Sequence, residues 1–353
     1  MALIGTINAS NDFGLKNRII NGAMVIDQRN AGAAIASPSD NYTTDRFYSR
    51  QVGGGVASAQ QSSTAPTGFV NSLLFTVTTP DSSIVTTDRY YVAQFIEGYN
   101  TADFAFGTAS ASYITLSFWV RSSLTGTFGG AIRNSGASRS YPFTYTINAA
   151  NTFEQKTITI AGDTSGTWLT TNGVGIQVIF GLGMGPTYSG TAGAWASADY
   201  LSATGATNVI ATNGATFYIT GVQLEKGSTT TAFDYRSIGT ELALCQRYYL
   251  QSGGGAYASI FGARGNTIST TLAALSFALP VSMRASPTLS YTGTPRLDNG
   301  QAGFNISALT GGITSVNLAT GTLSVTSSGL TVHQPVSIDA NAGGSIVSFS
   351  SEL

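Results

Sequence analysis

Ionisable side chains are scarce in this sequence. Aspartate, glutamate, lysine and arginine make up 9% of its 353 residues, against about 25% in an ordinary soluble protein. The 16 lysines and arginines are scattered without runs, so they form no electropositive stripe of the kind that neutralises nucleic-acid phosphates. Nucleic-acid binding is therefore not expected. The net charge of −1 provides little self-repulsion, which favours association into an oligomer.

Histidine and cysteine each occur once. Cys245 alone excludes an intramolecular disulfide and a cysteine-based zinc site, and its apolar surroundings favour a buried, inert thiol. His333 would have to serve any Ser-His-Asp arrangement, for example with Asp339, and no serine lies in a nucleophile-elbow sequence. Paired carboxylates for glycoside hydrolysis are harder to exclude, but the repeated pattern of a β-helical depolymerase is absent. We expect no enzymatic activity.

Long apolar runs and cofactor loops are missing too. No segment approaches 18 uninterrupted apolar residues, and residues 1–11 have neither a cationic flank nor an apolar core. We therefore expect no membrane insertion and no signal peptide. The glycines at 181–185 follow a predicted strand, but Pro186 and the residues after it are unable to open the helix that would hold a phosphate. No compact loop of alternating Asp and Asn indicates calcium, so no cofactor or metal is expected.

The sequence has instead a two-residue hydrophobic rhythm. Segment 113–121 (YITLSFWVR) is its clearest example, because Ile114, Leu116, Phe118 and Val120 share one face that we expect in the core. Strands are expected before the helix at 17–28, 45–51, 73–78, 90–97, 113–121, 126–134, 141–147, 153–160, 174–182 and 217–225. Eight to ten strands without helical crossovers predict an all-β jelly-roll β-sandwich.

The same pattern divides the chain into four parts. They are an N-terminal arm (1–16), the jelly-roll body (17–236), a connector with a short helix and a glycine joint (237–255) and a second, smaller β-sandwich (256–353). The arm is polar and rich in turn formers. An extended strap is expected over 229–235, at the end of the body. Ser237 or Thr240 is suited to cap the helix, and the glycines at 253–255 suit a flexible joint.

Four segments resemble the jelly-roll domains of bacteriophage tail-fibre and related virion proteins. They are NRIING at 17–22, TLSFWVR at 115–121, FYITGVQLEKGSTTTAFDYR at 217–236 and TELALCQRYY at 240–249. The resemblance implies a homotrimer on the tail or capsid surface of a virion, assembled in the host cytoplasm. It further implies attachment to a host surface glycan and contacts with other virion proteins through the arm. A purely structural virion role, as a head decoration, cement or fibre protein, stays open, and a polysaccharide depolymerase is a third interpretation.

Sugar binding requires an aromatic face for the C–H side of a pyranose and polar groups for its hydroxyls. Trp195 lies in a Gly/Ala/Ser-rich link, flanked by Tyr188 and Tyr200 and close to Asp199. One interpretation is an exposed aromatic cluster that binds a glycan. The alternative is that Trp195 plugs the end of the sandwich.

Trp119 and Arg121 are a second candidate pair for glycan binding. Both lie on the face of their strand opposite the aliphatic residues. That face is suited to line a sheet surface open to a ligand, but a second sheet or a trimer contact would cover such a face equally well.

Overall fold

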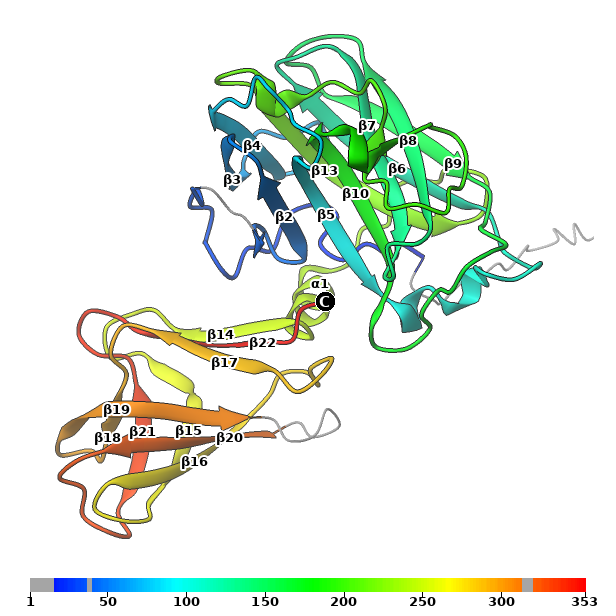
Figure 1. Cartoon of the computed structure of the whole chain (residues 1–353). Coiled ribbons are helices and arrows are strands. Elements are labelled where there is room, and N and C mark those ends of the chain that lie inside the picture. The colour runs from blue at the N-terminus through cyan, green and yellow to red at the C-terminus, as the bar shows by residue number, and fades with distance from the viewer. Residues whose placement is uncertain (1–15, 37–39, 313–319) are drawn as a thin grey trace, which may run out of the picture. The chain divides into compact units, whose positions relative to one another are not determined.

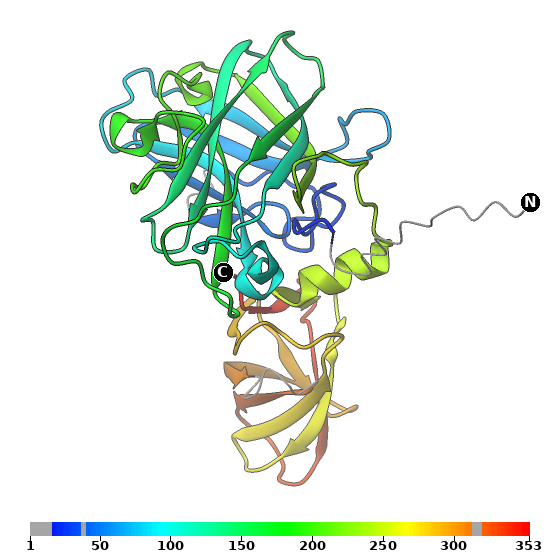
Figure 2. The same cartoon turned by 90° about the vertical axis from the view of Figure 1, so that its right-hand side faces the viewer.

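The computed structural model describes residues 16–36, 40–312 and 320–353. The chain divides into two compact units, of which the first ends at Arg236 and the second runs from Ser237 to Leu353. Strands make up most of the regular structure in both units, as Figure 1 and Figure 2 show from two sides. The chain is therefore all-β, as its two-residue rhythm predicts. The predicted arm lies outside the described residues apart from Lys16.

The first unit is a jelly-roll sandwich of two antiparallel sheets. The six-stranded sheet contains, in spatial order, β1 (Asn41–Tyr42), β2 (Phe47–Val52), β5 (Arg89–Glu97), β10 (Val174–Met184), β7 (Gly126–Asn134) and β8 (Ser140–Ile147). The five-stranded sheet contains β3 (Val56–Ser62), β4 (Ser72–Thr79), β13 (Thr216–Lys226), β6 (Ile114–Ser122) and β9 (Glu154–Ile160). Neighbouring strands come from distant parts of the sequence, so the chain crosses repeatedly between the sheets, as is typical of a jelly roll.

Short elements join these strands. They are the parallel pair β11 (Ser189–Gly190) and β12 (Ser202–Ala203), and the 3-10 helices η1 (Gly98–Asn100), η2 (Ala102–Phe104), η3 (Pro186–Tyr188) and η4 (Val209–Ala211). β12 contacts β7, β8 and β10, so the segment between η3 and η4 lies against the six-stranded sheet.

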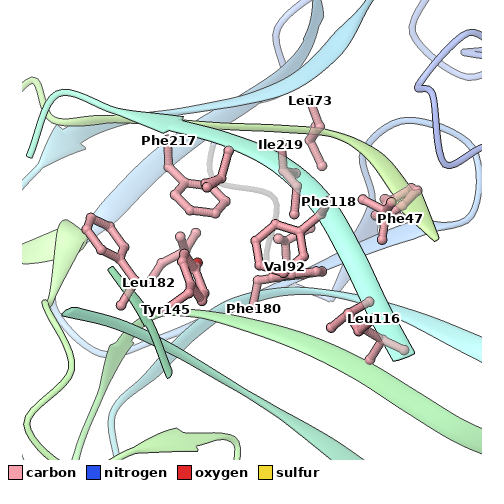
Figure 3. Packing of buried hydrophobic residues seen from close by; sticks show 14 of the residues in the cluster. Phe47, Leu73, Val92, Leu116, Phe118, Tyr145, Phe180, Leu182, Phe217 and Ile219 are labelled. Carbon is pink, nitrogen blue, oxygen red and sulfur yellow. The ribbon is translucent and has the colours of Figure 1, made fainter. Parts of the chain in front are cut away.

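The core of the sandwich lies between the two sheets. The even-numbered residues of β6 from Ile114 to Val120 are fully buried, which confirms the predicted core face. The Phe118 ring lies 5.0 Å from the Tyr145 ring and 5.0 Å from the Phe180 ring, both of which belong to the other sheet (Figure 3). Each large apolar side chain buried in this way stabilises the fold by about 2 kcal/mol. Because these residues point inward, their odd-numbered neighbours in β6 point outward.

Residues 17–28 form no strand, so the predicted first strand of the sandwich is wrong. The Asn17 side chain bonds β13 directly, donating to the Val222 carbonyl at 3.1 Å and accepting from the Leu224 N–H at 3.1 Å. Asn21 adopts a left-handed φ of 59°, and its side chain bonds both the N–H and the carbonyl of Ile26. Asparagine side chains, together with the backbone bonds Arg18 N–H to Leu224 O and Val222 N–H to Gly22 O, thus take the place of a regular strand ladder. Apolar alternation does not reveal this.

A strap of residues 227–236 follows β13 and lies along its outward face, as expected for 229–235. The Thr231 N–H donates to Glu225 at 2.9 Å, and the Asp234 N–H donates to Gln223 at 2.8 Å. Further along, the Tyr235 hydroxyl donates to the Gly68 carbonyl at 2.8 Å. The strap therefore covers one end of the outer face of the five-stranded sheet.

The second unit combines a helix, a small sheet and a closed barrel. The helix α1 (Ile238–Gln246) is capped by Ser237, and Cys245 is buried as expected. The sheet contains β14 (Tyr249–Gly253), β22 (Ile346–Ser350) and β17 (Thr288–Thr292). The barrel contains β15 (Ser259–Thr267), β16 (Leu272–Ala278), β20 (Thr320–Ser327), β19 (Gly303–Gly312), β18 (Arg296–Asp298) and β21 (Pro335–Asp339). This closed arrangement differs from the two stacked sheets of the predicted second sandwich.

The division between the units lies before the helix, not at the glycine joint. α1 belongs to the second unit, and β14 extends to Gly253 and pairs with β22, so 237–255 is not a connector between the units. Gly253 has a φ of 107°, and a Cβ there would come within 2.0 Å of the Ser345 carbonyl oxygen. Glycine is required at this position for close strand approach rather than for flexibility.

Candidate functional site

The structure separates the six predicted glycan-contact residues into distinct places. Tyr188 and Asp199 lie over the outer face of the six-stranded sheet, and the Tyr200 ring packs against Gly190. Trp195 lies at an edge of the sandwich beside β8. Trp119 and Arg121 lie on the outer face of the five-stranded sheet. The sequence neighbours of 188–200 thus do not form one aromatic cluster.

Trp195 closes the edge of the sandwich. Its half-buried indole packs against the core, with ring centroids 5.7 Å from Phe106, 5.2 Å from Tyr141 and 5.5 Å from Trp168. Its Nε1–H donates to the Ala161 carbonyl at 2.7 Å. Because its N–H is already bonded and its ring faces other rings, Trp195 has little left to offer a sugar.

The polar groups over the six-stranded sheet bond to one another. The Arg89 guanidinium donates to the Tyr188 hydroxyl and lies 4.7 Å from the centre of its ring. The Arg133 guanidinium donates to Asp199 and, at 2.7 Å, to Gln177 Oε1. A ligand that used these groups would have to compete with bonds that already exist.

The other side of this face shows the same pairing. The Tyr48 hydroxyl donates to Asp40, and the Arg50 guanidinium donates to the same carboxylate at 2.7 Å. Burial, followed by the hydrogen bond to Asp40, raises the pKa of the Tyr48 hydroxyl above its ordinary value, and burial likewise raises the pKa of Tyr91. Both hydroxyls therefore stay neutral at physiological pH, and Tyr48 stays a donor to Asp40.

The outer face of the five-stranded sheet is different. Strand register places Arg121 of β6 opposite Tyr218 of β13, and Trp119 between Thr220 of β13 and Gln155 of β9. Directly paired residues point to the same side of a sheet. We call this surface, formed by Trp119, Arg121, Phe153, Gln155 and Tyr218, the Trp119 face.

Arg121 has no polar partner on the Trp119 face. Its guanidinium carbon lies 4.9 Å from the centre of the Tyr218 ring and 5.9 Å from that of Phe153. Among the described residues it makes no hydrogen bond and no ion pair, and its Nε is buried without an acceptor. Two aromatic rings therefore hold a half-buried cation whose hydrogen-bonding capacity is unused.

Trp119 is also available. Its half-buried indole N–H has no hydrogen-bond partner among residues 16–36, 40–312 and 320–353. The β-bulge in β13 brings Gly221 beneath it, with a left-handed φ of 60°. A Cβ at Gly221 would lie 2.6 Å from the Phe69 ring and 3.0 Å from the Trp119 ring, so only glycine lets both rings settle there.

Phe69, Phe233 and Tyr235 form an aromatic cluster, which we call the wall, beside the Trp119 face. The Phe69 ring lies 5.1 Å from Phe233 and 5.6 Å from Tyr235, and the latter two rings are 4.8 Å apart. Tyr235 is 60% exposed, and burial of its hydroxyl region raises its pKa. The wall comes from the strap and from the loop between β3 and β4, so its residues meet only in the folded chain.

Sequence reasoning missed Tyr218, Phe153 and the wall. The alternation of 217–225 does carry a signal for Tyr218, because it separates this residue from Phe217 and Ile219, which are fully buried. Phe69 and Tyr235 lie in segments without periodicity, so no pattern brings them to this face.

Acidic side chains are scarce on the outer face of the five-stranded sheet. Of the outward-pointing residues of β6, β9 and β13, only Glu225 is acidic, and its carboxylate accepts hydrogen bonds from Thr231.

No cluster of three or more His, Cys, Asp or Glu side chains suited to a metal is found in the described part of the chain. None of the described helices is long and apolar enough to span a bilayer.

Comparison with known proteins yields distant structural similarities. No protein-family model matches the sequence, and no curated protein matches it. The enzymatically active domain of tailspike protein 4 of bacteriophage CBA120 is similar with a TM-score of 0.34 and 15% identity, over 60% of this chain and 21% of that domain. A putative sugar-binding protein from Bacteroides thetaiotaomicron is similar with a TM-score of 0.34 and 10% identity, over 60% of this chain and all of that one.

A family 11 carbohydrate-binding module from Clostridium thermocellum, solved with a mixed-linked tetrasaccharide, is similar with a TM-score of 0.30 and 12% identity. The similarity covers 56% of this chain and 98% of the module. Similarity at these values does not assign a ligand to this chain.

Proposed function

We propose that this chain is a glycan-binding attachment protein that uses the Trp119 face. The observation that carries the proposal is the pair of half-buried, unpartnered groups on that face, the Trp119 indole and the Arg121 guanidinium. An indole presents a flat apolar surface to the C–H side of a pyranose, and a guanidinium presents donors to its oxygens. Gln155 adds an exposed amide beside them.

The biological setting of this proposal is the surface of a bacteriophage virion. Its support is the resemblance of residues 17–249 to tail-fibre proteins, together with the low net charge. In this setting the chain is a homotrimer that binds other virion proteins through residues 1–16 and host polysaccharide through the first unit. Three weak sites on one particle would gain avidity through effective concentration, so no single site has to bind tightly.

The experiment is a glycan array and whole-cell binding assay with two matched variants. Trp119→Leu and Tyr188→Leu each replace an aromatic ring by an aliphatic side chain, one on each outer face of the sandwich. We expect Trp119→Leu to weaken glycan binding by about tenfold or more, the effect of losing one stacking platform. We expect Tyr188→Leu to bind like the wild type.

Two other outcomes would contradict the proposal. Absence of glycan and cell binding, together with tight binding to empty capsids, would assign the chain a structural role in the virion. Release of reducing ends from host polysaccharide by the purified protein would show that it is a depolymerase.

A further inference from the structure

Arg121 differs from the other cationic side chains of the first unit. Each of the other described lysines and arginines up to Arg236 has a hydrogen-bond acceptor or a nearby carboxylate. They are Lys16, Arg18, Arg29, Arg46, Arg50, Arg89, Arg133, Arg139, Lys156, Lys226 and Arg236. The first unit thus pairs nearly all of its described cations, and its exception lies on the Trp119 face.

An unpaired guanidinium in a half-buried site is costly, because it gives up part of its hydration without gaining an acceptor. The rings of Tyr218 and Phe153 recover some of this energy and hold the guanidinium in place. Its Nε is buried without an acceptor, as are those of Arg18 and Arg50, but unlike theirs its terminal NH2 groups also make no hydrogen bond in the described chain. The Arg121 side chain is therefore preorganised, and its donors are free to bind an acceptor from outside this chain.

The outward-pointing neighbours of Arg121 on the paired strands are uncharged. Its cross-strand neighbour is Tyr218, and the nearest outward residues of the adjacent positions are Trp119, Thr220 and Gln155, all uncharged. The Thr220 hydroxyl, fully buried, also has no hydrogen-bond partner in the described chain. Glu154 lies between Phe153 and Gln155, but its carboxylate is bonded by Lys156 and by the backbone at 148 and 149. A carboxylate that approaches this face would therefore meet one free guanidinium and no unpaired acid among these neighbours.

We propose that the glycan bound by the Trp119 face is acidic, and that its anionic group pairs with Arg121. This inference rests on the proposed function and adds the class of ligand. A planar guanidinium suits a carboxylate, sulfate or phosphate group because it donates two parallel hydrogen bonds. In this arrangement a sugar unit stacks on Trp119 while the anionic group of the same or the next unit reaches Arg121.

The test uses uronate-containing oligosaccharides, each paired with its carboxyl-reduced, neutral counterpart, and methyl glucuronide paired with methyl glucoside at millimolar concentration. Sulfated oligosaccharides paired with desulfated ones distinguish sulfate from carboxylate. Binding is followed through the Trp119 indole signal. We expect the wild type to prefer the acidic member of a pair by about tenfold, the contribution of one charge-assisted hydrogen-bonded pair.

Two substitutions of Arg121 sharpen the test. Arg121→Gln removes the charge and breaks no hydrogen bond in the described chain, so it should fold normally and bind the acidic member of a pair no better than the neutral one. Arg121→Lys keeps the charge without the planar donors and should retain part of the preference.

Three results would overturn the inference. Equal binding of the acidic and the neutral member by the wild type would refute an anionic ligand. The proposed glycan-binding function would be unaffected. An Arg121→Gln variant that assembles less well but binds glycans unchanged would assign Arg121 to a subunit interface. If no probe disturbs the Trp119 signal while other surfaces bind sugar, both the inference and the proposed use of the Trp119 face fail.

Discussion

The two outer faces of the sandwich carry similar residues, but these residues differ in their hydrogen-bond partners. Both have tyrosines and arginines at outward strand positions. On the six-stranded sheet, Arg133 donates to Gln177 and Asp199, and Arg89 donates to Tyr188. On the five-stranded sheet, Arg121 lies against the rings of Tyr218 and Phe153, and neither Arg121 nor Trp119 makes a hydrogen bond within the described chain.

This difference shows that two faces of similar composition can differ in how their polar groups are paired. An arginine that already has carboxylate and amide partners stabilises its own fold, and a ligand must displace those partners. An arginine without partners has free N–H donors, and their acceptors have to come from another molecule. If this pairing matters, substitutions on the two faces should differ in their effects on stability and on glycan binding.

The largest expected effect is that of Gly221→Ala. Its Cβ would enter the space between the Phe69 and Trp119 rings and force an alanine into left-handed φ. We expect a loss of about 3 kcal/mol in the free energy of unfolding, measured by urea denaturation, and loss of glycan binding in the folded fraction.

Gly214→Ala is the matched control. Gly214 also has a left-handed φ, of 71°, but a Cβ there would have no neighbour within 4 Å. Backbone strain alone should cost about 1 kcal/mol and leave binding unchanged. Equal losses in the two variants would show that ring placement around Gly221 is not what requires glycine.

A smaller effect on the free energy of unfolding is expected when Arg133 and Arg121 are compared. Arg133→Met breaks the bonds to Gln177 and Asp199, and because Asp199 is partly exposed the expected loss is about 1 kcal/mol. Arg121→Met breaks no hydrogen bond in the described chain, so its free energy of unfolding should be unchanged or slightly higher. Urea denaturation of both variants measures the difference, and a greater loss for Arg121→Met would contradict the comparison.

The contribution of the ring at Phe153 is smaller still. Phe153→Leu removes one of the two rings that hold Arg121, so acidic-glycan affinity should fall about threefold, in line with a weak cation–π contact. Tyr42→Leu is the control, because Tyr42 holds Arg29 in the same manner, at 5.1 Å, on the other sheet. An equal fall in both variants, measured by titration, would show that Phe153 has no particular role.

The smallest effect concerns acid pH. Burial opposes the shift, but hydrogen bonds from Lys156 and from the residues at 148 and 149 lower the pKa of Glu154 from 4.5 to about 2. A lowered folded-state pKa stabilises the fold above pH 4.5 and loses this contribution as pH falls towards 2. Glu154 holds the turn that precedes Phe153, so Glu154→Gln should flatten the fall in thermal midpoint between about pH 5 and 2. An unchanged pH profile would exclude this role.

Several features of the face follow from the sequence. Alternation in β6 predicts that Trp119 and Arg121 share the surface opposite Phe118, and both lie there. The state of Arg121 is not predictable in the same way, because its neighbours Tyr218 and Phe153 reach it only through the register of β6 with β13 and β9. A one-residue slip in that register would place other residues beside Arg121.

Other features escape sequence analysis for identifiable reasons. β3 reads VASAQQS, which is small and polar and lacks the bulky residues that indicate a strand. The segment 17–28 has the alternation of a strand, but Asn17 and Asn21 bond the backbone themselves. Trp195 has a loop composition around it, yet its ring completes the edge of the core.

The most direct test of the account is a proton–nitrogen correlation spectrum of the three tryptophan indoles during glycan titration. The Trp168 and Trp195 N–H groups are bonded to the carbonyls of Ser165 and Ala161, whereas that of Trp119 has no partner within the described chain. We predict that the Trp119 resonance alone shifts as the glycan binds. A shift of the Trp195 or Trp168 resonance, with that of Trp119 unmoved, would contradict the assignment of the binding face.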